Sequence, residues 1–222
     1  MSDLSDRLKA LETRLDAACA RARRPREAVK LVAVSKLHPP SAIEAAYALG
    51  LRDFGENYAQ ELRDKARLLA AHSDIVWHAI GPVQPKNAKY VAAAASVFHA
   101  LVSAEVADEL QRRRAGAPLD VLIEVNLAGE ASKAGVTPDE ARALAKHVGD
   151  LKNLKLVGLT SMPPLVEDAE KNRPYFRAIA ELAKELGLPQ LSMGTTADFE
   201  VAIEEGATYV RVGTALFGER PT

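Results

Sequence analysis

The sequence predicts an α/β fold, a (β/α)8 TIM barrel that forms a single domain over residues 1–222. Short β-type runs alternate with longer helical runs about eight times along the chain. No Ser/Gly-rich linker, block of like charges or low-complexity tract divides it. A doubly wound open sheet is the main alternative fold. Its dinucleotide-binding form requires G-x-G-x-x-G at the first strand-to-helix turn, and here that turn reads SKLHPP.

The predicted elements follow one another in a regular order. A charged helical pattern covers roughly residues 3–23, within an N-terminal helical extension of residues 1–28 that packs outside the barrel or across its bottom. The predicted strands are residues 30–35, 53–56, 75–81, 97–101, 120–126, 154–160, 190–193 and 209–213. The predicted helices between them are residues 40–49, 58–71, 86–95, 103–115, 137–149, 174–187 and 197–206.

Helix start and stop signals support this division. Ser41 and Thr137 precede helical runs as N-cap candidates. Thr137 is followed by Pro138 in the first turn and by Glu140 three residues on, which predicts a capping box. Glycines stand where helices should end, at Gly50, Gly187 and Gly206.

Composition excludes several classes of function. The chain has 29 Lys and Arg against 30 Asp and Glu, a net charge of −1, which argues against nucleic acid and anionic membranes as partners. The only cysteine, Cys19, cannot form an internal disulfide, and the histidines lack metal-ligand spacing, so no metal site is expected. The sequence shows neither an apolar run long enough to span a membrane nor a signal peptide, and we expect a cytoplasmic protein.

Polar residues collect where the predicted strands end, which is where the active sites of such barrels lie. The segment SMGTT supplies Ser192, a glycine and the hydroxyl of Thr196 before a helix. The segment RVGT supplies Gly213 and Thr214 at a short helical turn. Taken singly, Thr196 would merely cap a helix and Gly213 would merely make a turn. On adjacent strand ends, the two segments together predict a phosphate site.

Lys36 ends the first strand, which neighbours the eighth strand in a closed barrel. A partly desolvated lysine amine beside a phosphate site suggests a Schiff base with a phosphorylated carbonyl compound, either pyridoxal 5'-phosphate (PLP) or a sugar phosphate. Arg211 stands two residues before Gly213, so both point into the barrel mouth. A guanidinium there would donate to a pyridine nitrogen, which suits a racemase-like site or a cofactor holder. The alternative is an ion pair between Arg211 and Glu56 or another acid.

A set of ordered motifs resembles one known family. The segments VAVSK, FGENYAQE, WHAIGPVQ, SKAGV, RPYFRA and LSMGTTADFEVAIEEGATYVRVGTALFGER occur in the order and at the spacing of the pyridoxal-phosphate homeostasis proteins, also called the YggS-like family. The resemblance covers residues from about 30 to 220. It implies the fold of the N-terminal barrel of alanine racemase, PLP fold type III, with PLP as the cofactor.

The resemblance also implies roles for individual residues. Lys36 matches the lysine that forms the internal aldimine, and Arg211 matches the arginine that faces the pyridine nitrogen. Thr196 stands where the family usually has a phosphate-binding serine. The remaining predicted cofactor-binding residues are Asn57, His78, Ser192, Gly213 and Thr214. No residue is predicted to be catalytic.

Three segments depart from the family pattern. The usual SMGMS reads SMGTT here, which keeps a hydroxyl at residue 196. The usual GLMxMP reads GLTSMP, with Thr160 in place of methionine. The usual QxNKxK reads QPKNAK, which exchanges the order of Asn and Lys at Lys86 and Asn87 and puts any inherited role of that loop in doubt. The role of Lys133 in SKAGV is also open.

These observations predict a PLP-binding protein that holds the cofactor as a lysine aldimine and takes part in intracellular PLP homeostasis without substantial catalysis. In alanine racemase, the resemblance implies, the opposing tyrosine comes from a second domain, and this sequence ends at Pro221-Thr222, directly after the last barrel element. The alternative is an enzyme, either an amino-acid racemase or a Schiff-base aldolase. PLP-requiring apo-enzymes are the expected partners, and a monomer is the expected state.

Overall fold

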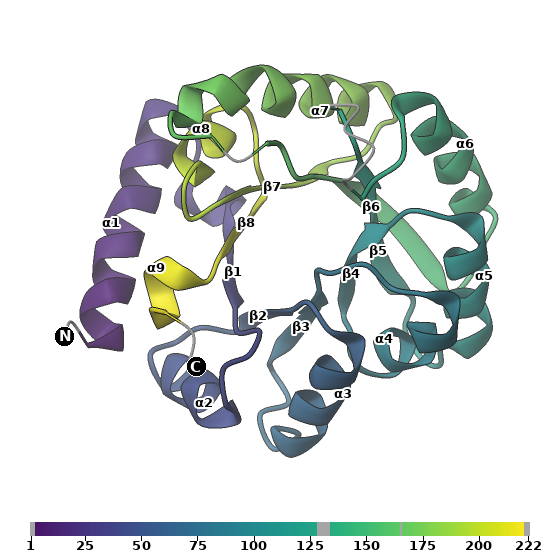
Figure 1. The fold of residues 1–222 in the computed structure, drawn as a ribbon, viewed down its shortest axis with the longest axis horizontal. Coiled ribbons are helices and arrows are strands. Elements are labelled where there is room, and N and C mark those ends of the chain that lie inside the picture. Colours follow the sequence, from purple (N-terminus) through teal and green to yellow (C-terminus); the bar gives the residue numbers. More distant parts are fainter. Residues whose placement is uncertain (1–2, 128–133, 165, 220–222) are drawn as a thin grey trace.

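Eight parallel strands close into a barrel in the computed structural model, which describes residues 3–127, 134–164 and 166–219 (Figure 1). Each strand pairs with the next along the chain, and β1 also pairs with β8. The predicted (β/α)8 barrel is therefore confirmed. The strands are β1 (Lys30–Val34), β2 (Asp53–Glu56), β3 (Val76–Ala79), β4 (Val97–Leu101), β5 (Leu119–Val125), β6 (Leu154–Ser161), β7 (Gln190–Thr195) and β8 (Tyr209–Val212).

An outer ring of helices surrounds the strands (Figure 1). After the strands come α2 (Pro40–Ala48), α3 (Ala59–Leu68), α4 (Ala88–Ala94), α5 (Ala104–Arg113), α6 (Pro138–Gly149), α7 (Arg173–Glu185), α8 (Phe199–Glu204) and α9 (Thr214–Phe217). Three 3-10 turns lie between these elements: η1 (Arg26–Ala28), η2 (Pro85–Asn87) and η3 (Ala169–Asn172).

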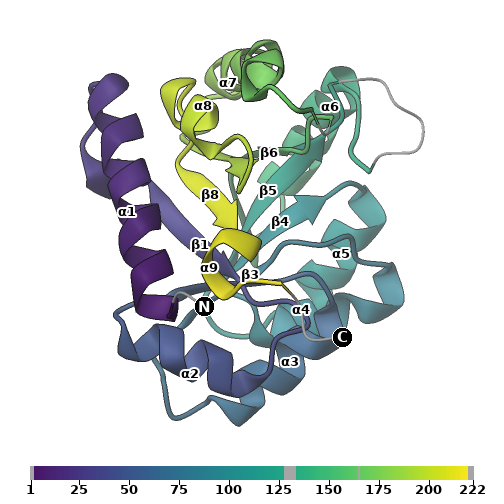
Figure 2. The same ribbon diagram turned by 60° about the vertical axis from the view of Figure 1, so that its left-hand side comes forward.

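The extra N-terminal helix α1 (Leu4–Arg21) lies on the outside of the barrel, not across its bottom (Figure 2). It packs against α8 and α9, beside β1 and β8. Because α9 has only four residues, α1 covers the flank that a longer final helix would cover in other barrels. Its buried face has helical spacing and consists of Leu11, Leu15, Ala18 and Cys19.

Of the two predicted N-caps, the structure has the one at Thr137 and not the one at Ser41. The capping box is present, because Thr137 N donates to Glu140 Oε2 at 2.8 Å and Glu140 N donates to Thr137 Oγ1 at 3.3 Å. The prediction for Ser41 was wrong, because α2 already begins at Pro40 with Pro39 as its N-cap. A proline has the φ angle of a first helical residue and lacks the N–H that a cap would satisfy.

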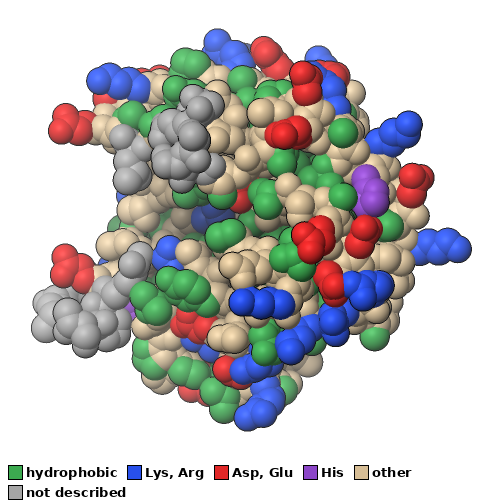
Figure 3. All heavy atoms as spheres, turned by 45° about the vertical axis from the view of Figure 1, so that its right-hand side comes forward, with side chains coloured by type: hydrophobic (Ala, Val, Ile, Leu, Met, Phe, Trp, Pro, Cys, Tyr) green, Lys and Arg blue, Asp and Glu red, His purple; other side chains and the backbone are tan. Residues whose placement is uncertain are grey.

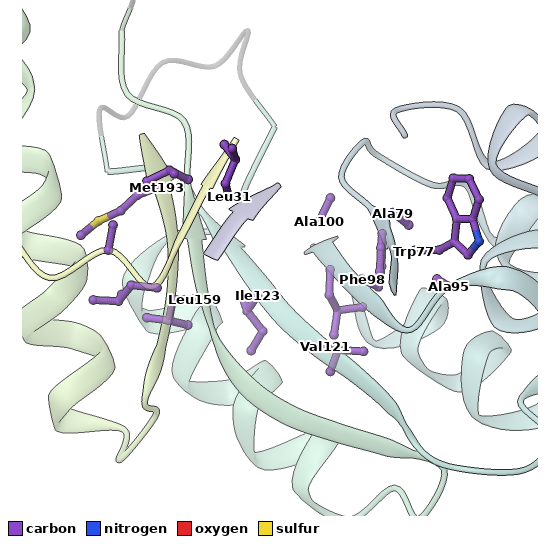
Figure 4. Packing of buried hydrophobic residues seen from close by; sticks show 14 of the residues in the cluster. Leu31, Trp77, Ala79, Ala95, Phe98, Ala100, Val121, Ile123, Leu159 and Met193 are labelled. Carbon is purple, nitrogen blue, oxygen red and sulfur yellow. The ribbon is translucent and has the colours of Figure 1, made fainter. Parts of the chain in front are cut away.

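Strand alternation divides the apolar core into two parts. Leu31 and Ala33 of β1 pack outward in the larger cluster between strands and helices, part of which is drawn in Figure 4. Val32 points the other way, into the barrel. The interior cluster consists of Val32, Val97, Leu122, Val157 and Tyr209, with Val76 packed against it.

The outer surface carries both signs of charge close together on the face shown in Figure 3. This interspersion agrees with the net charge of −1. Within the three described ranges, no helix is long and apolar enough to cross a membrane.

Candidate functional site

A cavity of about 490 Å³ opens at the carboxyl ends of the strands. This size lies within the roughly 300–1,000 Å³ of typical small-molecule sites. Six of the eight predicted site residues line it: Lys36, Asn57, Thr196, Arg211, Gly213 and Thr214. Residues from four strand ends are thus brought to one place, as the barrel geometry requires.

Lys36 lies two residues after the end of β1 and lines the cavity from a turn. The preceding Ser35 is fully buried, whereas Lys36 is half-buried. The next residue, Leu37, has φ of 64°, which is uncommon for a residue with a side chain. The chain therefore changes direction sharply at the lysine, and something must hold this turn in place.

A buried ionic group holds both neighbours of Lys36; we call Ser35, Glu56, Glu61 and Lys65 the Lys65 cluster. Lys65 Nζ donates to Ser35 O at 2.8 Å and to Glu56 Oε1 at 2.7 Å. It also lies 2.8 Å from Glu61 Oε1. That oxygen accepts the backbone N–H of Leu37 at 2.8 Å. The turn is thus fixed on both sides of the lysine by hydrogen bonds to charged groups.

The Lys65 cluster places two carboxylates around one ammonium. Glu56 is only 1 % exposed, and its Oε2 has no hydrogen-bond partner among the described residues. Burial raises the pKa of Glu56 to about 7, and the bonds from Lys65 oppose that rise only in part. The sequence offered an ion pair between Arg211 and Glu56 as an alternative. Glu56 is paired with Lys65 instead, which excludes that alternative.

The phosphate end predicted from SMGTT and RVGT is built from β7, β8 and the turns after them. Asp198 Oδ1 accepts from Thr195 N at 2.7 Å and from Thr195 Oγ1 at 3.0 Å. Thr195 and Thr196 both line the cavity, but the Thr195 hydroxyl is already bonded within the protein. Gly213 is the N-cap of α9, and a Cβ there would lie 3.2 Å from Val34 O, so glycine allows the close approach of β1 to the chain after β8.

Arg211 is buried in the wall of the cavity, and most of its N–H groups are bonded to the protein. Nη1 donates to Ser192 O at 2.7 Å and to the Ser192 hydroxyl. Nη2 donates to Ser161 O at 3.1 Å and lies 2.8 Å from Met162 Sδ. Among the described residues, the Nε–H has no such partner. Burial lowers the pKa of Arg211 to about 10, while the nearby Glu124 opposes this shift, so the side chain remains a cation at neutral pH.

His78 and Ser192 lie where the sequence did not place them. His78 is fully buried in the barrel interior, with its ring nitrogens bonded to Asp53 at 2.9 Å and to His99 at 2.8 Å. Ile80, two residues further on and directly after β3, lines the cavity instead. Ser192 is also fully buried and contacts Arg211 from below. Neither residue is among those that line the cavity, and their expected contact with a cofactor stays a prediction.

Sequence reasoning missed Glu124 and His38, which line the cavity together with Gly81. Glu124 is 7 % exposed, and burial raises the pKa of its carboxyl while Arg211 opposes the rise. Its inward direction could have been found from the alternation of β5. Gly81 packs so tightly that a Cβ would lie 2.2 Å from Asn57 O. His38, whose ring centroid lies 5.1 Å from that of Phe217, also lines the cavity.

The sequence left open the role of the loop with Lys86 and Asn87 and the role of Lys133. Lys86 and Asn87 belong to η2, and Asn87 lines a smaller cavity of about 140 Å³ that shares Asn57 with the main one. Any role of this loop remains a prediction. Lys133 lies outside the described residues.

Among the described residues, no group of three His, Cys, Asp or Glu side chains is arranged to hold a metal ion.

Comparison with known proteins gives the class of this barrel. Residues 7–221 match the family described as alanine racemase, N-terminal domain. The solved alanine racemase of Corynebacterium glutamicum has the same fold, with a TM-score of 0.68 at 18 % identity over 93 % of this chain and 61 % of that one. The chain is therefore a barrel of the alanine racemase N-terminal type.

More similar proteins define the family within that class. The pyridoxal phosphate homeostasis protein of Aquifex aeolicus is 44 % identical over 97 % of both chains. The human protein of that name is 38 % identical over 96 % of this chain and 85 % of its own. PipY of Synechococcus elongatus, solved with PLP bound, has a TM-score of 0.85 and 33 % identity over 97 % of this chain and 100 % of that one. The chain belongs to the pyridoxal phosphate homeostasis protein family.

Proposed function

We propose that this chain binds PLP in the cavity at the barrel mouth and takes part in PLP homeostasis without substantial catalysis. One observation carries the proposal: a lysine, an arginine donor and a phosphate-type pair of strand ends line the same cavity. These three features match the aldehyde, the ring nitrogen and the phosphate of PLP. The homologous PipY, solved with PLP bound, supports the same cofactor.

Each residue at the cavity has a distinct role in this proposal. PLP supplies an aldehyde that forms a Schiff base with an amine, and Lys36 is the amine in this cavity. Thr196, Gly213 and Thr214 bind the phosphate through hydroxyl and backbone N–H groups. The Nε–H of Arg211 donates to the ring nitrogen and, because arginine does not release its proton, leaves that nitrogen unprotonated.

An unprotonated ring nitrogen makes the bound cofactor a poor electron sink, which favours storage over transamination. We propose that the protein buffers a reactive aldehyde in the cytoplasm and delivers it to PLP-requiring apo-enzymes. Residues 1–222 act as a single domain in this proposal, and the working state is a monomer. Sedimentation of the holo-protein tests the last point.

An absorbance scan of the purified protein, loaded with PLP, tests the cofactor. We expect a visible Schiff-base band that disappears on borohydride reduction and is missing in Lys36→Ala. Lys152→Ala is the matched control, because Lys152 is exposed in the turn before β6, at the opposite end of the barrel. A wild-type protein that stays colourless after incubation with PLP would contradict the proposal.

Turnover separates a carrier from an enzyme. The holo-protein is incubated with L-alanine and other L-amino acids, and D-isomers are measured against a PLP-only control. We expect less than one D-isomer per protein molecule. Multiple turnovers would support the racemase alternative and overturn the non-catalytic part of the proposal.

A further inference from the structure

A chain of hydrogen-bonded side chains crosses the interior of the barrel beneath the cavity. It begins at Asp53 in the first position of β2 and ends at Arg211 in β8. Asp53 Oδ1 lies 2.9 Å from His78 Nε2, and His78 Nδ1 lies 2.8 Å from His99 Nε2. His99 Nδ1 lies 2.8 Å from Ser192 Oγ, which accepts from Arg211 Nη1. We call Asp53, His78, His99 and Ser192 the histidine relay.

The relay is a product of strand alternation around the closed barrel. Its members come from β2, β3, β4 and β7, and each sits at an inward-facing position of its strand. Both imidazoles are fully buried, and the ring of Tyr209 packs edge-on against them, with centroid distances of 5.7 Å to His78 and 5.3 Å to His99. Only Asp53 reaches solvent, with 21 % of its side chain exposed.

Asp53 at one end of the relay and Arg211, which donates to its other end, fix the direction of every hydrogen bond in it. A guanidinium can only donate, and an ionised carboxylate can only accept. Burial lowers the pKa of both histidines, that of His99 well below 6.5, so each ring is neutral and has one donor and one acceptor. The one arrangement that satisfies all four contacts puts the proton of both rings on Nε2. Every donor then points from the cavity toward Asp53.

We propose that the histidine relay is a positioning device for Arg211, which it holds with the Nε–H turned to the cavity and thereby sets the affinity for a ring nitrogen. This inference rests on the proposed function, from which it takes PLP as the ligand. Its geometry comes from the hydrogen bonds of the relay. Without such an anchor, the guanidinium has a competing partner close by, because the Glu124 carboxylate lines the same cavity. The relay offers Nη1 a polarised hydroxyl whose own proton is committed to His99.

The tautomers test the geometry without any cofactor. In 15N-labelled apo-protein, the ring nitrogens of His78 and His99 are observed by NMR at pH 7 and assigned with the variants His78→Gln and His99→Gln. We expect both rings to be neutral with the proton on Nε2. A charged ring, or a proton on Nδ1 of either one, would overturn the proposed direction of the relay, whether or not the protein binds PLP.

The variants His99→Leu and His99→Gln test the effect on the ligand. Leucine removes both hydrogen bonds of the ring, whereas glutamine offers one donor and one acceptor. We expect PLP affinity, measured by titrating apo-protein, to fall on the order of 10-fold in His99→Leu, with a shift of the visible band, and to recover in part in His99→Gln. Tyr209→Phe is the control, since Tyr209 packs against both rings without being a member of the relay.

The outcomes separate positioning from mere filling of the barrel. If Tyr209→Phe and His99→Gln lose as much affinity as His99→Leu, the relay acts only through packing and the proposal fails. It also fails if folded His99→Leu binds PLP like the wild type with an unchanged spectrum. Where His99→Leu does not fold, Ser192→Ala replaces it, because this change removes the hydroxyl that joins His99 to Arg211 and leaves both histidine rings in place. A wild-type protein that does not bind PLP defeats the proposed function, and the NMR result then decides the relay.

Discussion

The Lys65 cluster beneath Lys36 and the histidine relay beneath Arg211 are both buried, but the first is ionic and the second is neutral except at its ends. The first fixes backbone on both sides of Lys36, and the second fixes one side chain. Burial disfavours the charged form in each, so it raises the pKa of a carboxyl and lowers that of an imidazole. The comparison shows that two supports of one cavity respond to pH in opposite directions.

The largest effect on the free energy of unfolding is expected when Lys65, the cation of the Lys65 cluster, is removed. Lys65→Met leaves Glu56 and Glu61 facing each other at a buried position, and we expect a loss of about 3–5 kcal/mol in the free energy of unfolding. Urea unfolding at pH 7 measures it. Lys184→Met, at an exposed position of α7, is the control. A loss below about 1 kcal/mol would show that the cluster does not depend on its charge.

The contribution of the Lys65 cluster to stability should depend on pH through Glu56. The pKa of Glu56 rises from 4.5 to about 7 on folding, so the folded state binds its proton more tightly than the unfolded state. Its stabilising contribution is complete below pH 4.5 and is lost as the pH rises through 7. The loss is on the order of 3 kcal/mol.

The variant Glu56→Gln cannot titrate, and its unfolding free energy should therefore decline less than that of the wild type between pH 5 and 8. Glu44→Gln, at an exposed position of α2, should keep the wild-type decline. Urea unfolding of the wild type and both variants at several pH values measures these declines. Parallel curves for Glu56→Gln and the wild type would contradict a raised pKa at this carboxyl.

The histidine relay should show the opposite trend on the acid side. The folded pKa of His99 lies below its unfolded value of 6.5, so its contribution is present above pH 6.5 and is lost as the pH falls. His99→Gln removes this loss, on the order of 2 kcal/mol between pH 7 and pH 5. The slope of unfolding free energy against pH is the measurement, since the variant also shifts stability at every pH. An unchanged slope would mean that His99 takes up a proton in the folded state.

The sequence predicted the barrel well because its signals are local. Each strand carries its own apolar run, and closure between β1 and β8 follows from having eight of them. Residues at strand ends, such as Lys36 and Gly213, were placed correctly for the same reason. How deep a side chain lies inside the barrel was not predictable in this way. Inward-facing residues recur every second position along a strand, and the sequence does not show whether His78 or Ile80 reaches the cavity. The Lys65 cluster was missed because its partners come from separate elements.

The smallest effect concerns Leu37, the strained residue whose N–H donates to Glu61 of the Lys65 cluster. A left-handed φ costs an L-residue roughly 1–2 kcal/mol, and the greater freedom of glycine in the unfolded chain offsets about half of the relief. With half of its side chain exposed, Leu37 loses little packing, and Leu37→Gly should gain less than about 1 kcal/mol in unfolding free energy. Arg23→Gly, at φ of 54° away from the cavity, should behave alike.

The double variant Leu37→Gly/Glu61→Gln shows whether this strain belongs to the Lys65 cluster. The N–H of Leu37 donates to Glu61 Oε1 at 2.8 Å, so part of the stabilisation from Glu61 is used to hold the left-handed turn. Glycine holds the turn without that bond, and Glu61→Gln should therefore cost less in the Leu37→Gly background than in the wild type. Strict additivity of the two changes in urea unfolding would mean that the turn at Lys36 is held by something other than the ionic cluster.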